Sequence, residues 1–273
     1  MGAIVSTLAF PYPPKRRSAK ALRARGNQLI FLETTKSKHR IPAIHIQRRS
    51  ATFTILYSHG NAEDVGICLR YLDAMSNICK ANVLAYEYPG YSVAQGKPSE
   101  ENCYQAIQAA YQYLTTQAGV PPSKIVVFGR SLGTGPSVDL CSRLVESSQG
   151  ECVAGCILQS PLESAIRCAI GCVTACTLYP IDIFQNYLKV DRIRCPVFIL
   201  HGADDKVVPC ANGRNLYQQL QERSCHSQVA YEPIWLPGRG HNDMPQVECL
   251  QHCREFILFL KERQQHASSH FES

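Results

Sequence analysis

The sequence predicts an α/β protein with a mostly parallel, doubly wound sheet, helices on both faces and a small cap region. Short apolar, β-branched segments alternate with longer amphipathic segments, which is the order of strands and crossover helices. The chain has 273 residues, which is compatible with one large domain of this class. A glycine-flanked serine between a strand and a helix, described below, narrows the prediction further.

The first half of the sheet is expected to come from segments bounded by turn residues. Two early strands are separated by a polar turn, and the next strand is apolar enough to be buried on both faces. A serine followed by two glutamates predicts the start of the second helix. Strands are expected at residues 27–32, 41–47, 53–58 and 82–88, and helices at 65–79 and 99–118.

The second half continues the same alternation. Pro136 is compatible with a helix there because it falls in the first turn. The apolar segment 163–177 is expected to be a helix near the pocket mouth, where it would form a cap. Strands are expected at residues 125–128, 153–159, 196–200 and 229–236, and helices at 134–144, 163–177, 213–222 and 247–263.

The segment Gly129–Gly133 has the pattern G-x-S-x-G between a predicted strand and a predicted helix. This is the context of a nucleophile elbow, in which a sharp turn exposes the serine hydroxyl and the flanking glycines allow close packing. The helix N-terminus behind the serine favours developing negative charge. The pattern therefore predicts Ser131 as a nucleophile and the α/β-hydrolase fold, the alternative being an ordinary glycine-rich turn.

The order serine, acid, histidine along the chain is the one that the α/β-hydrolase fold uses. Ser131, Asp205 and His241 follow this order, each in a loop after a predicted strand. His241 is expected to be the general base, because imidazole can accept and return a proton near neutral pH. Asp205 is favoured over its neighbour Asp204 as the acid that orients the histidine. The alternative for His241 is a structural histidine.

Backbone amides are expected to stabilise the oxyanion. The segment His59–Asp64 follows the third predicted strand, where hydrolases of this fold place one oxyanion amide. Asn61 is the predicted donor there, and Leu132 is the predicted donor after the serine. Asn61 and Asp64 also fit turn and cap positions for the helix at 65–79.

The N-terminus predicts attachment to a membrane surface. Residues 1–50 hold eleven Lys/Arg and one Asp/Glu, whereas the rest of the chain has a net charge of −4. Gly2 fits the myristoylation pattern, and a second signal is needed because one acyl chain binds only marginally. A disordered, soluble basic tail is the alternative. The basic residues expected to contact anionic lipid are Lys15, Arg16, Arg17, Lys20, Arg23 and Arg25.

Several classes of protein are not favoured by the composition. The chain has fourteen cysteines, none before Cys68, and no secretory signal, so we expect reduced thiols. Cys168, Cys172 and Cys176 share a helix face without His or carboxylate, which does not favour a metal site. No apolar run is long enough to span a membrane; the nearest candidate is Ala165–Leu178. The body shows no basic surface that indicates nucleic acid.

Four motifs together resemble the α/β-hydrolase domain-containing protein 17 family. They are Tyr57–Gly66, Gly96–Glu100, Ser160–Leu162 and Gly240–Asp243, and the resemblance extends from about residue 5 to residue 262. The resemblance implies removal of palmitate from protein cysteines at membranes. It also implies a triad at the serine, aspartate and histidine named above, with Asn61 in the oxyanion-loop motif.

Two features depart from that family. Animal members carry a palmitoylated N-terminal cysteine cluster that this chain lacks; its Met1-Gly2 start resembles plant-like and protist-like members. Arg130 stands before the nucleophile where glutamine is expected, which could alter the preferred acyl chain or protein substrate.

The sequence therefore predicts a serine hydrolase that removes palmitate from cysteines of membrane-associated proteins, without a cofactor. A lipid esterase acting on monoacylglycerol or lysophospholipid and an inactive membrane-tethered scaffold are the alternatives. The expected location is the cytoplasmic face of the plasma membrane or endomembranes. The expected organisation is a membrane-targeting segment at 1–26, a hydrolase domain at 27–264 and a polar tail at 265–273.

Overall fold

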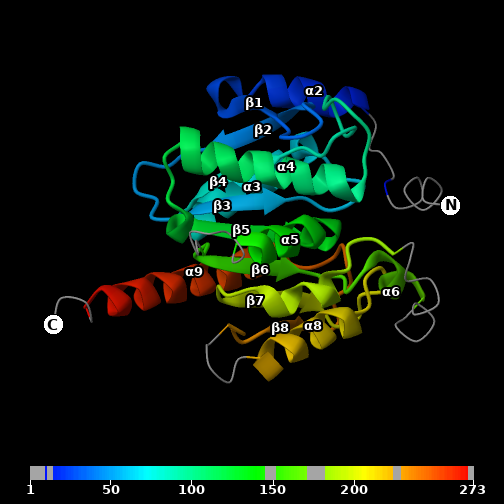
Figure 1. Ribbon diagram of the computed structural model, residues 1–273, viewed down its shortest axis with the longest axis vertical. Coiled ribbons are helices and arrows are strands. Elements are labelled where there is room, and N and C mark those ends of the chain that lie inside the picture. Colours follow the sequence, from blue (N-terminus) through cyan, green and yellow to red (C-terminus); the bar gives the residue numbers. More distant parts are fainter. Residues whose placement is uncertain (1–9, 11–14, 145–151, 171–181, 224–228, 270–273) are drawn as a thin grey trace.

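A computed structural model of the chain describes residues 10, 15–144, 152–170, 182–223 and 229–269 (Figure 1). The elements match the predicted alternation of strands and helices. The strands are β1 Leu29–Glu33, β2 Arg40–Ile46, β3 Thr54–Ser58, β4 Asn82–Tyr86, β5 Ile125–Arg130, β6 Gly155–Gln159, β7 Val197–Gly202 and β8 Ile234–Leu236. The helices are α2 Lys15–Arg23, α3 Val65–Cys79, α4 Glu100–Gln112, α5 Thr134–Leu144, α6 Ala165–Ile170, α8 Cys210–Arg223 and α9 Gln246–Ser269.

The described strands form one sheet in the order β1-β2-β4-β3-β5-β6-β7-β8. β2 pairs antiparallel with β1 and with β4, and every pair from β4 to β8 is parallel. The register places Ser58 beside Gly129 and Arg130 beside Gln159. The loops that follow the parallel strands therefore meet at one edge of the sheet. This confirms the predicted fold class.

Helices cover both faces of the sheet (Figure 1). α4, α5 and α8 lie in front of the sheet in this view, and α3 and α9 lie behind it. The buried apolar residues accordingly form two clusters, one on each face. The central strand β5 is buried on both faces up to Gly129, which explains its continuous apolar run.

Two helices begin at the residues that the sequence signals. Asp64 caps α3, and its carboxylate accepts a hydrogen bond from the Ile67 amide at 2.9 Å. Ser99 caps α4 by accepting from the Asn102 amide at 3.1 Å. Such caps satisfy amides that have no partner within the helix. The two caps therefore set the residues at which α3 and α4 begin.

The basic segment at the N-terminus contains a helix packed on the body. Ser18 and Leu22 of α2 are buried, and the Ser18 hydroxyl lies 2.8 Å from that of Ser92. Ser18 also lies against Gly66, where a Cβ would come within 2.7 Å of the serine. Arg25 forms two hydrogen bonds with the Asp73 carboxylate, at 2.6 and 2.8 Å. The helix before residue 26 therefore packs on the hydrolase body, and the predicted domain boundary at residue 26 stays a prediction.

Two other elements differ from the prediction, and a third is described only in part. The helix predicted at 163–177 as a cap is described as α6 up to Ile170. Residues 171–177 lie outside the described residues. The last strand, β8, is shorter than predicted and has three residues. Pro233 directly precedes it, and proline has no amide to donate to a neighbouring strand. Of the predicted residues before Pro233, Ala230 forms an isolated bridge with Val197. The predicted polar tail is helical to Ser269, because no glycine or proline ends α9.

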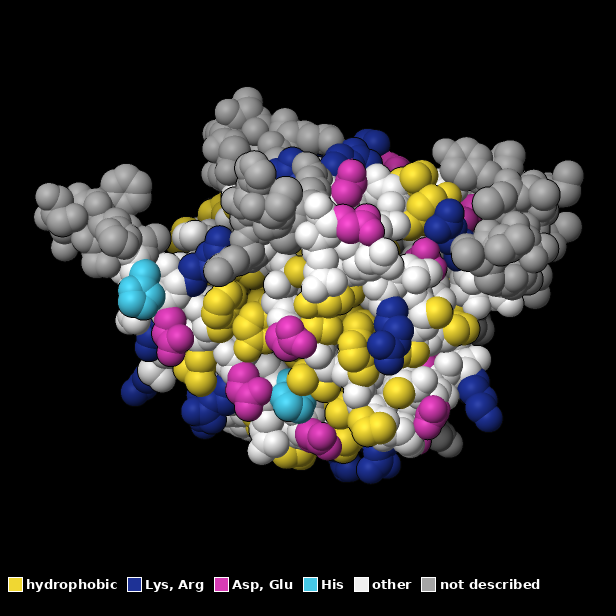
Figure 2. Space-filling model, turned by 90° about the horizontal axis from the view of Figure 1, so that it is seen from below, with side chains coloured by type: hydrophobic (Ala, Val, Ile, Leu, Met, Phe, Trp, Pro, Cys, Tyr) yellow, Lys and Arg dark blue, Asp and Glu magenta, His cyan; other side chains and the backbone are white. Residues whose placement is uncertain are grey.

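Figure 2 shows the β8 edge of the molecule, seen from below Figure 1. Hydrophobic side chains on this face are interspersed with acidic and basic ones, so the face does not carry charge of one sign. Across the described ranges, no helix combines the length and the hydropathy that crossing a bilayer requires.

Candidate active site

Ser131 lies at the tip of a sharp turn between β5 and α5. Its backbone is left-handed, with φ of +52°, which is rare for a residue with a side chain. A Cβ at Gly129 would lie 2.5 Å from the Gly133 carbonyl oxygen, and a Cβ at Gly133 would lie 2.2 Å from the Ser58 carbonyl oxygen. Both glycines are therefore required by close backbone packing. The turn has the geometry of a nucleophile elbow.

The structure brings the predicted serine, histidine and aspartate together from three loops. The Nε2 atom of His241 lies 3.0 Å from the Ser131 hydroxyl. The other ring nitrogen, Nδ1, lies 2.7 Å from Oδ2 of Asp205. A neutral imidazole that donates from Nδ1 to the carboxylate leaves Nε2 free to accept the serine proton. This arrangement can activate a hydroxyl as a nucleophile.

The environment of Asp205 keeps its carboxylate charged and oriented. Oδ1 accepts hydrogen bonds from the Val207 and Val208 amides, both at 2.8 Å. Burial alone would raise the pKa of Asp205, but hydrogen bonds from His201, His241 and the Val208 amide outweigh burial and lower it. Asp204 is exposed, and its amide donates to the Arg239 carbonyl. The structure thus places Asp205, rather than its neighbour, on the histidine.

The loop after β3 lies beside the elbow. The close packing of Gly133 on the carbonyls of Ser58 and His59 sets the two loops against each other. The side chain of Asn61 accepts a hydrogen bond from the Tyr91 hydroxyl at 2.8 Å. The predicted oxyanion residues Asn61 and Leu132 therefore occupy adjacent loops. Two adjacent loops of this kind can each supply one amide to a developing charge.

A buried ion pair between His59 and Glu87 supports the loop that follows β3. Nε2 of His59 lies 2.8 Å from Glu87, and both side chains are almost completely buried. Nδ1 of His59 lies 2.9 Å from the Gly60 carbonyl, which can only accept. Burial alone would lower the pKa of His59, but Glu87 and the Gly60 carbonyl outweigh burial and raise it. Sequence reasoning did not identify this pair, although the His-Gly motif marked the loop.

Arg130, the residue before the nucleophile, lines a cavity together with Glu63 and Asn242. Nη1 forms an ion pair with Glu63. Nη2 donates to the Asn242 side chain at 3.2 Å and to the His241 carbonyl at 3.4 Å. Sequence reasoning singled out Arg130 as unusual but did not predict its partners. Its expected effect on substrate preference remains a prediction.

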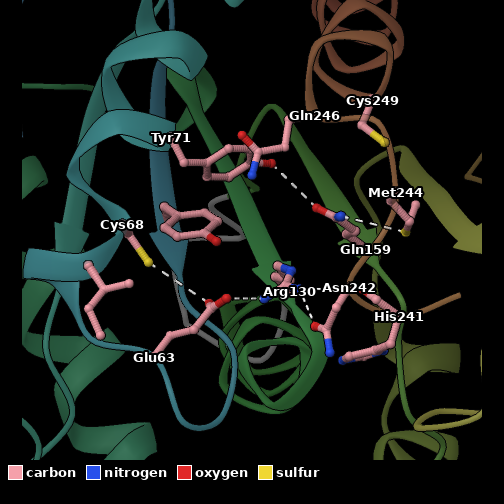
Figure 3. Close-up of a pocket in the computed structure, with 12 residues that line it drawn as sticks. Glu63, Cys68, Tyr71, Arg130, Gln159, His241, Asn242, Met244, Gln246 and Cys249 are labelled. Carbon is pink, nitrogen blue, oxygen red and sulfur yellow. Dashed lines mark hydrogen bonds and ion pairs between the residues drawn. The ribbon is translucent and has the colours of Figure 1, made fainter. Parts of the chain in front are cut away.

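A cavity of about 250 Å³ lies between the N-terminal ends of α3 and α9 (Figure 3). Figure 3 shows Arg130 between Glu63 and Asn242, with His241 at the edge of the cavity. Polar groups and aromatic rings share its walls, and Tyr71 donates to Gln159 across it at 3.4 Å. The lining residues are Tyr57, Glu63, Ile67, Cys68, Tyr71, Arg130, Gln159, His241, Asn242, Met244, Gln246 and Cys249.

Apolar side chains adjoin the elbow on its α5 side. Phe184 packs against Gly135, where a Cβ would lie 2.3 Å from its ring. The rings of Phe10 and Phe184 meet edge to face with centroids 6.1 Å apart, and Phe10 is buried. Residue 10 from the N-terminus thus reaches the region next to the nucleophile. No pattern in the sequence predicts this contact.

The predicted membrane-binding residues have different surroundings. Gly2 lies outside the described residues. α2 begins at Lys15, and the side chains of residues 15–17 are not described. Lys20 and Arg23 are exposed on α2, whereas Arg25 is paired with Asp73.

The cysteines within the described ranges are free thiols, and most are buried. Burial raises the pKa of Cys168 and of Cys249 to about 11. Such thiols are weak nucleophiles near neutral pH. In this part of the chain no group of three or more His, Cys, Asp or Glu is arranged to hold a metal. Cys172 and Cys176 lie outside it.

The chain is similar to several proteins of known family. It is 39% identical to α/β-hydrolase domain-containing protein aho-3 of Caenorhabditis elegans over 225 residues, covering 82% of this chain and 63% of that protein. It is 37% identical to human α/β-hydrolase domain-containing protein 17C, covering 84% of this chain and 65% of that one. Human protein 17B is 34% identical, with coverage of 83% and 74%. The chain thus spans less than two thirds of the length of aho-3.

A family model and solved structures also match. The family described as Chlamydia CHLPS protein (DUF818) matches residues 41–150. The Pyrococcus furiosus esterase Pf2001 has a TM-score of 0.64 at 15% identity, covering 93% of this chain and 99% of that one. An α/β-hydrolase from Vibrio vulnificus has a TM-score of 0.63 at 17% identity, covering 90% and 88%. At this identity the structures show a shared fold.

Proposed function

Because this chain belongs to the α/β-hydrolase domain-containing protein 17 family, and is by family and fold a hydrolase, we propose that it removes fatty acyl groups, principally palmitate, from cysteines of membrane-bound proteins. The observation that carries the proposal is the continuous hydrogen-bonded path from Ser131 through His241 to Asp205. This path supplies a nucleophile for an acyl carbonyl. The choice of thioester rests on the family resemblance.

The reaction would proceed through an acyl-enzyme. Ser131 attacks the thioester carbonyl while His241 accepts the serine proton through Nε2. The tetrahedral intermediate collapses, and the cysteine thiolate leaves and takes up a proton. Water then attacks the acyl-serine with His241 again as the base, which releases the fatty acid and restores the serine. Asp205 stabilises the imidazolium formed in each half-reaction.

Electrostatic stabilisation of the oxyanion would come from the amides of Asn61 and Leu132. Removal of one such donor in a well-studied protease costs roughly 3 kcal/mol of transition-state stabilisation. The packing of Gly133 on the β3 end supports this role, because it holds the two donor loops together. No cofactor enters this proposal.

The proposed attachment to a membrane also uses the body of the protein. Ile67 is 56% exposed and Val93 is 43% exposed, and both are next in sequence to residues that contact Ser18 of α2. Apolar side chains beside a helix with exposed basic residues favour the surface of an anionic bilayer. Lys20 and Arg23 remain available for this contact, while Asp73 largely neutralises Arg25. Acylation of Gly2 would supply the main anchor.

An acyl panel tests the proposed substrate. Purified protein is offered S-acyl peptides of increasing chain length and oxygen esters matched to each of them. The proposal expects the S-palmitoyl peptide to be hydrolysed with the highest kcat/KM. A preference for monoacylglycerol or lysophospholipid would replace it with the lipid-esterase alternative. Failure of every substrate and of fluorophosphonate labelling would favour the inactive scaffold.

A further inference from the structure

Resting on the proposed hydrolase function, we propose that Arg130 is a positioning residue: with Glu63, it holds the histidine loop against the oxyanion loop. Here the oxyanion loop means residues 59–64 and the histidine loop means residues 237–245. Arg130 does not touch the reacting atoms in this role. It sets the distance between the loops that do.

The need for such a tether follows from the strand order. The histidine loop leaves β8, whereas the nucleophile and the oxyanion loop follow β5 and β3, and β6 and β7 lie between. On one side, the loop is fixed to the β7 end, where the Asp204 amide donates to the Arg239 carbonyl at 2.9 Å. Asp205 bonds His241 from the same side. These contacts do not reach the oxyanion loop.

Arg130 provides the link from the other side. Its Nη2 donates to the Asn242 side chain at 3.2 Å and to the His241 carbonyl at 3.4 Å, so it holds the backbone of the base itself. Its Nη1 is paired with Glu63 in the oxyanion loop. Because Arg130 immediately precedes Ser131, one guanidinium connects the nucleophile elbow, the oxyanion loop and the histidine loop (Figure 3). A planar guanidinium with several fixed donors suits a contact of this kind.

Glu63 completes the connection inside the oxyanion loop. Its Oε2 accepts a hydrogen bond from the Gly60 amide at 3.0 Å. A Cβ at Gly60 would lie 3.1 Å from Nη1 of Arg130 and 3.2 Å from the Glu63 carboxylate. The ion pair therefore lies directly against the backbone that leads to Asn61. Movement of the pair would move the predicted oxyanion donor.

The ion pair between Arg130 and Glu63 is largely buried, which restricts its movement. The Arg130 side chain is 16% exposed and that of Glu63 is 26% exposed. Burial alone would lower the pKa of Arg130, but Glu63 outweighs burial and raises it. Removing either partner leaves the other charge partly buried without its counter-ion. The oxyanion loop and the histidine loop would then no longer be connected through Arg130.

The experiment measures kcat and KM on one chromogenic acyl ester for Arg130→Met, Arg130→Lys, Glu63→Gln and the double variant. Rates are normalised to the fraction of serine that a fluorophosphonate labels at completion, and melting temperature reports folding. Arg143→Met is the matched control, because Arg143 also pairs with a carboxylate, Asp139 at 2.7 Å, but on the surface of α5.

Arg130→Met should lower kcat and the rate of fluorophosphonate labelling by about tenfold or more, the scale of a lost charged hydrogen bond, with KM within about twofold. Arg130→Lys should recover part of the loss. Glu63→Gln should cause a similar loss, and the double variant should be no worse than Arg130→Met, because one tether is broken in each case. Arg143→Met should leave kcat unchanged.

The positioning role is overturned if Arg130→Met keeps the wild-type kcat per labelled serine, or if the losses of the two single variants multiply. It is also overturned if the melting temperature falls while kcat per labelled serine is unchanged, since that indicates a purely structural pair. Labelling depends on the catalytic geometry and not on thioester preference. If the wild type labels but spares S-palmitoyl peptides, the proposed substrate fails while the role of Arg130 is still decided.

Discussion

Replacing Asp205 with asparagine tests the orientation of the proposed base. Asparagine keeps the shape of aspartate but carries one oxygen and one NH₂ group. The amides of Val207 and Val208 both donate to Oδ1 at 2.8 Å, so the asparagine oxygen should occupy that position. The NH₂ group must then face Nδ1 of His241, where Oδ2 lies at 2.7 Å in the native protein.

The consequence is the wrong tautomer of the base. With an NH₂ donor at Nδ1, the imidazole carries its proton on Nε2 and cannot accept the proton of Ser131. The same exchange in a serine protease lowers kcat by about 10⁴-fold, which corresponds to roughly 5 kcal/mol. We expect Asp205→Asn to lower kcat by a similar factor, with KM changed much less.

The assay compares hydrolysis and fluorophosphonate labelling of Asp205→Asn with those of Asp204→Asn. The second variant is a matched control, because Asp204 is exposed and bonds the histidine loop through its backbone amide, which the substitution keeps. Asp204→Asn should retain nearly full activity. If Asp204→Asn lost more activity than Asp205→Asn, the assignment of the acid would be refuted.

Three further predictions concern the thiols, the anchor and the elbow. Thiol counting under denaturing, non-reducing conditions should approach all fourteen cysteines, and several stable disulfides would contradict the free thiols of the described residues. Gly2→Ala should release the protein from membranes in cell fractionation while leaving hydrolysis of a soluble thioester unchanged; full retention on membranes would rule out Gly2 as the main anchor. Gly133→Ala should lower the free energy of unfolding by about 1–3 kcal/mol or more, because its Cβ would overlap the Ser58 and His59 carbonyls. Wild-type stability in a denaturant titration would mean that the close packing is relieved at little cost.

The elbow and the triad are the parts of the site that the sequence alone predicts. Ser131, Asp205 and His241 could be predicted because each follows a strand, and parallel strands bring such loops to one edge. The bounds of α3 could also be predicted, since Asp64 is a strong cap signal. These inferences depend on local sequence patterns and on the rule that parallel strands of one sheet end at the same edge.

Contacts between distant residues could not be predicted in the same way. Glu63 and Arg130 are 67 residues apart, and neither residue type indicates its partner. The basic segment before residue 26 resembled a tail because charge dominates its composition. Its helix packs on the body through Leu22 and through Arg25, whose partner Asp73 is 48 residues away. Such pairings depend on the folded arrangement of the helices.

Trapping the acyl-enzyme would show directly whether Ser131 is the nucleophile. The protein is mixed with an S-palmitoyl peptide, quenched in acid within the first turnover and digested for mass spectrometry. We expect a palmitoyl group on the peptide that contains Ser131, and no such adduct in Ser131→Ala. Hydrolysis of the substrate with the acyl group on another residue, or undiminished in Ser131→Ala, would contradict it.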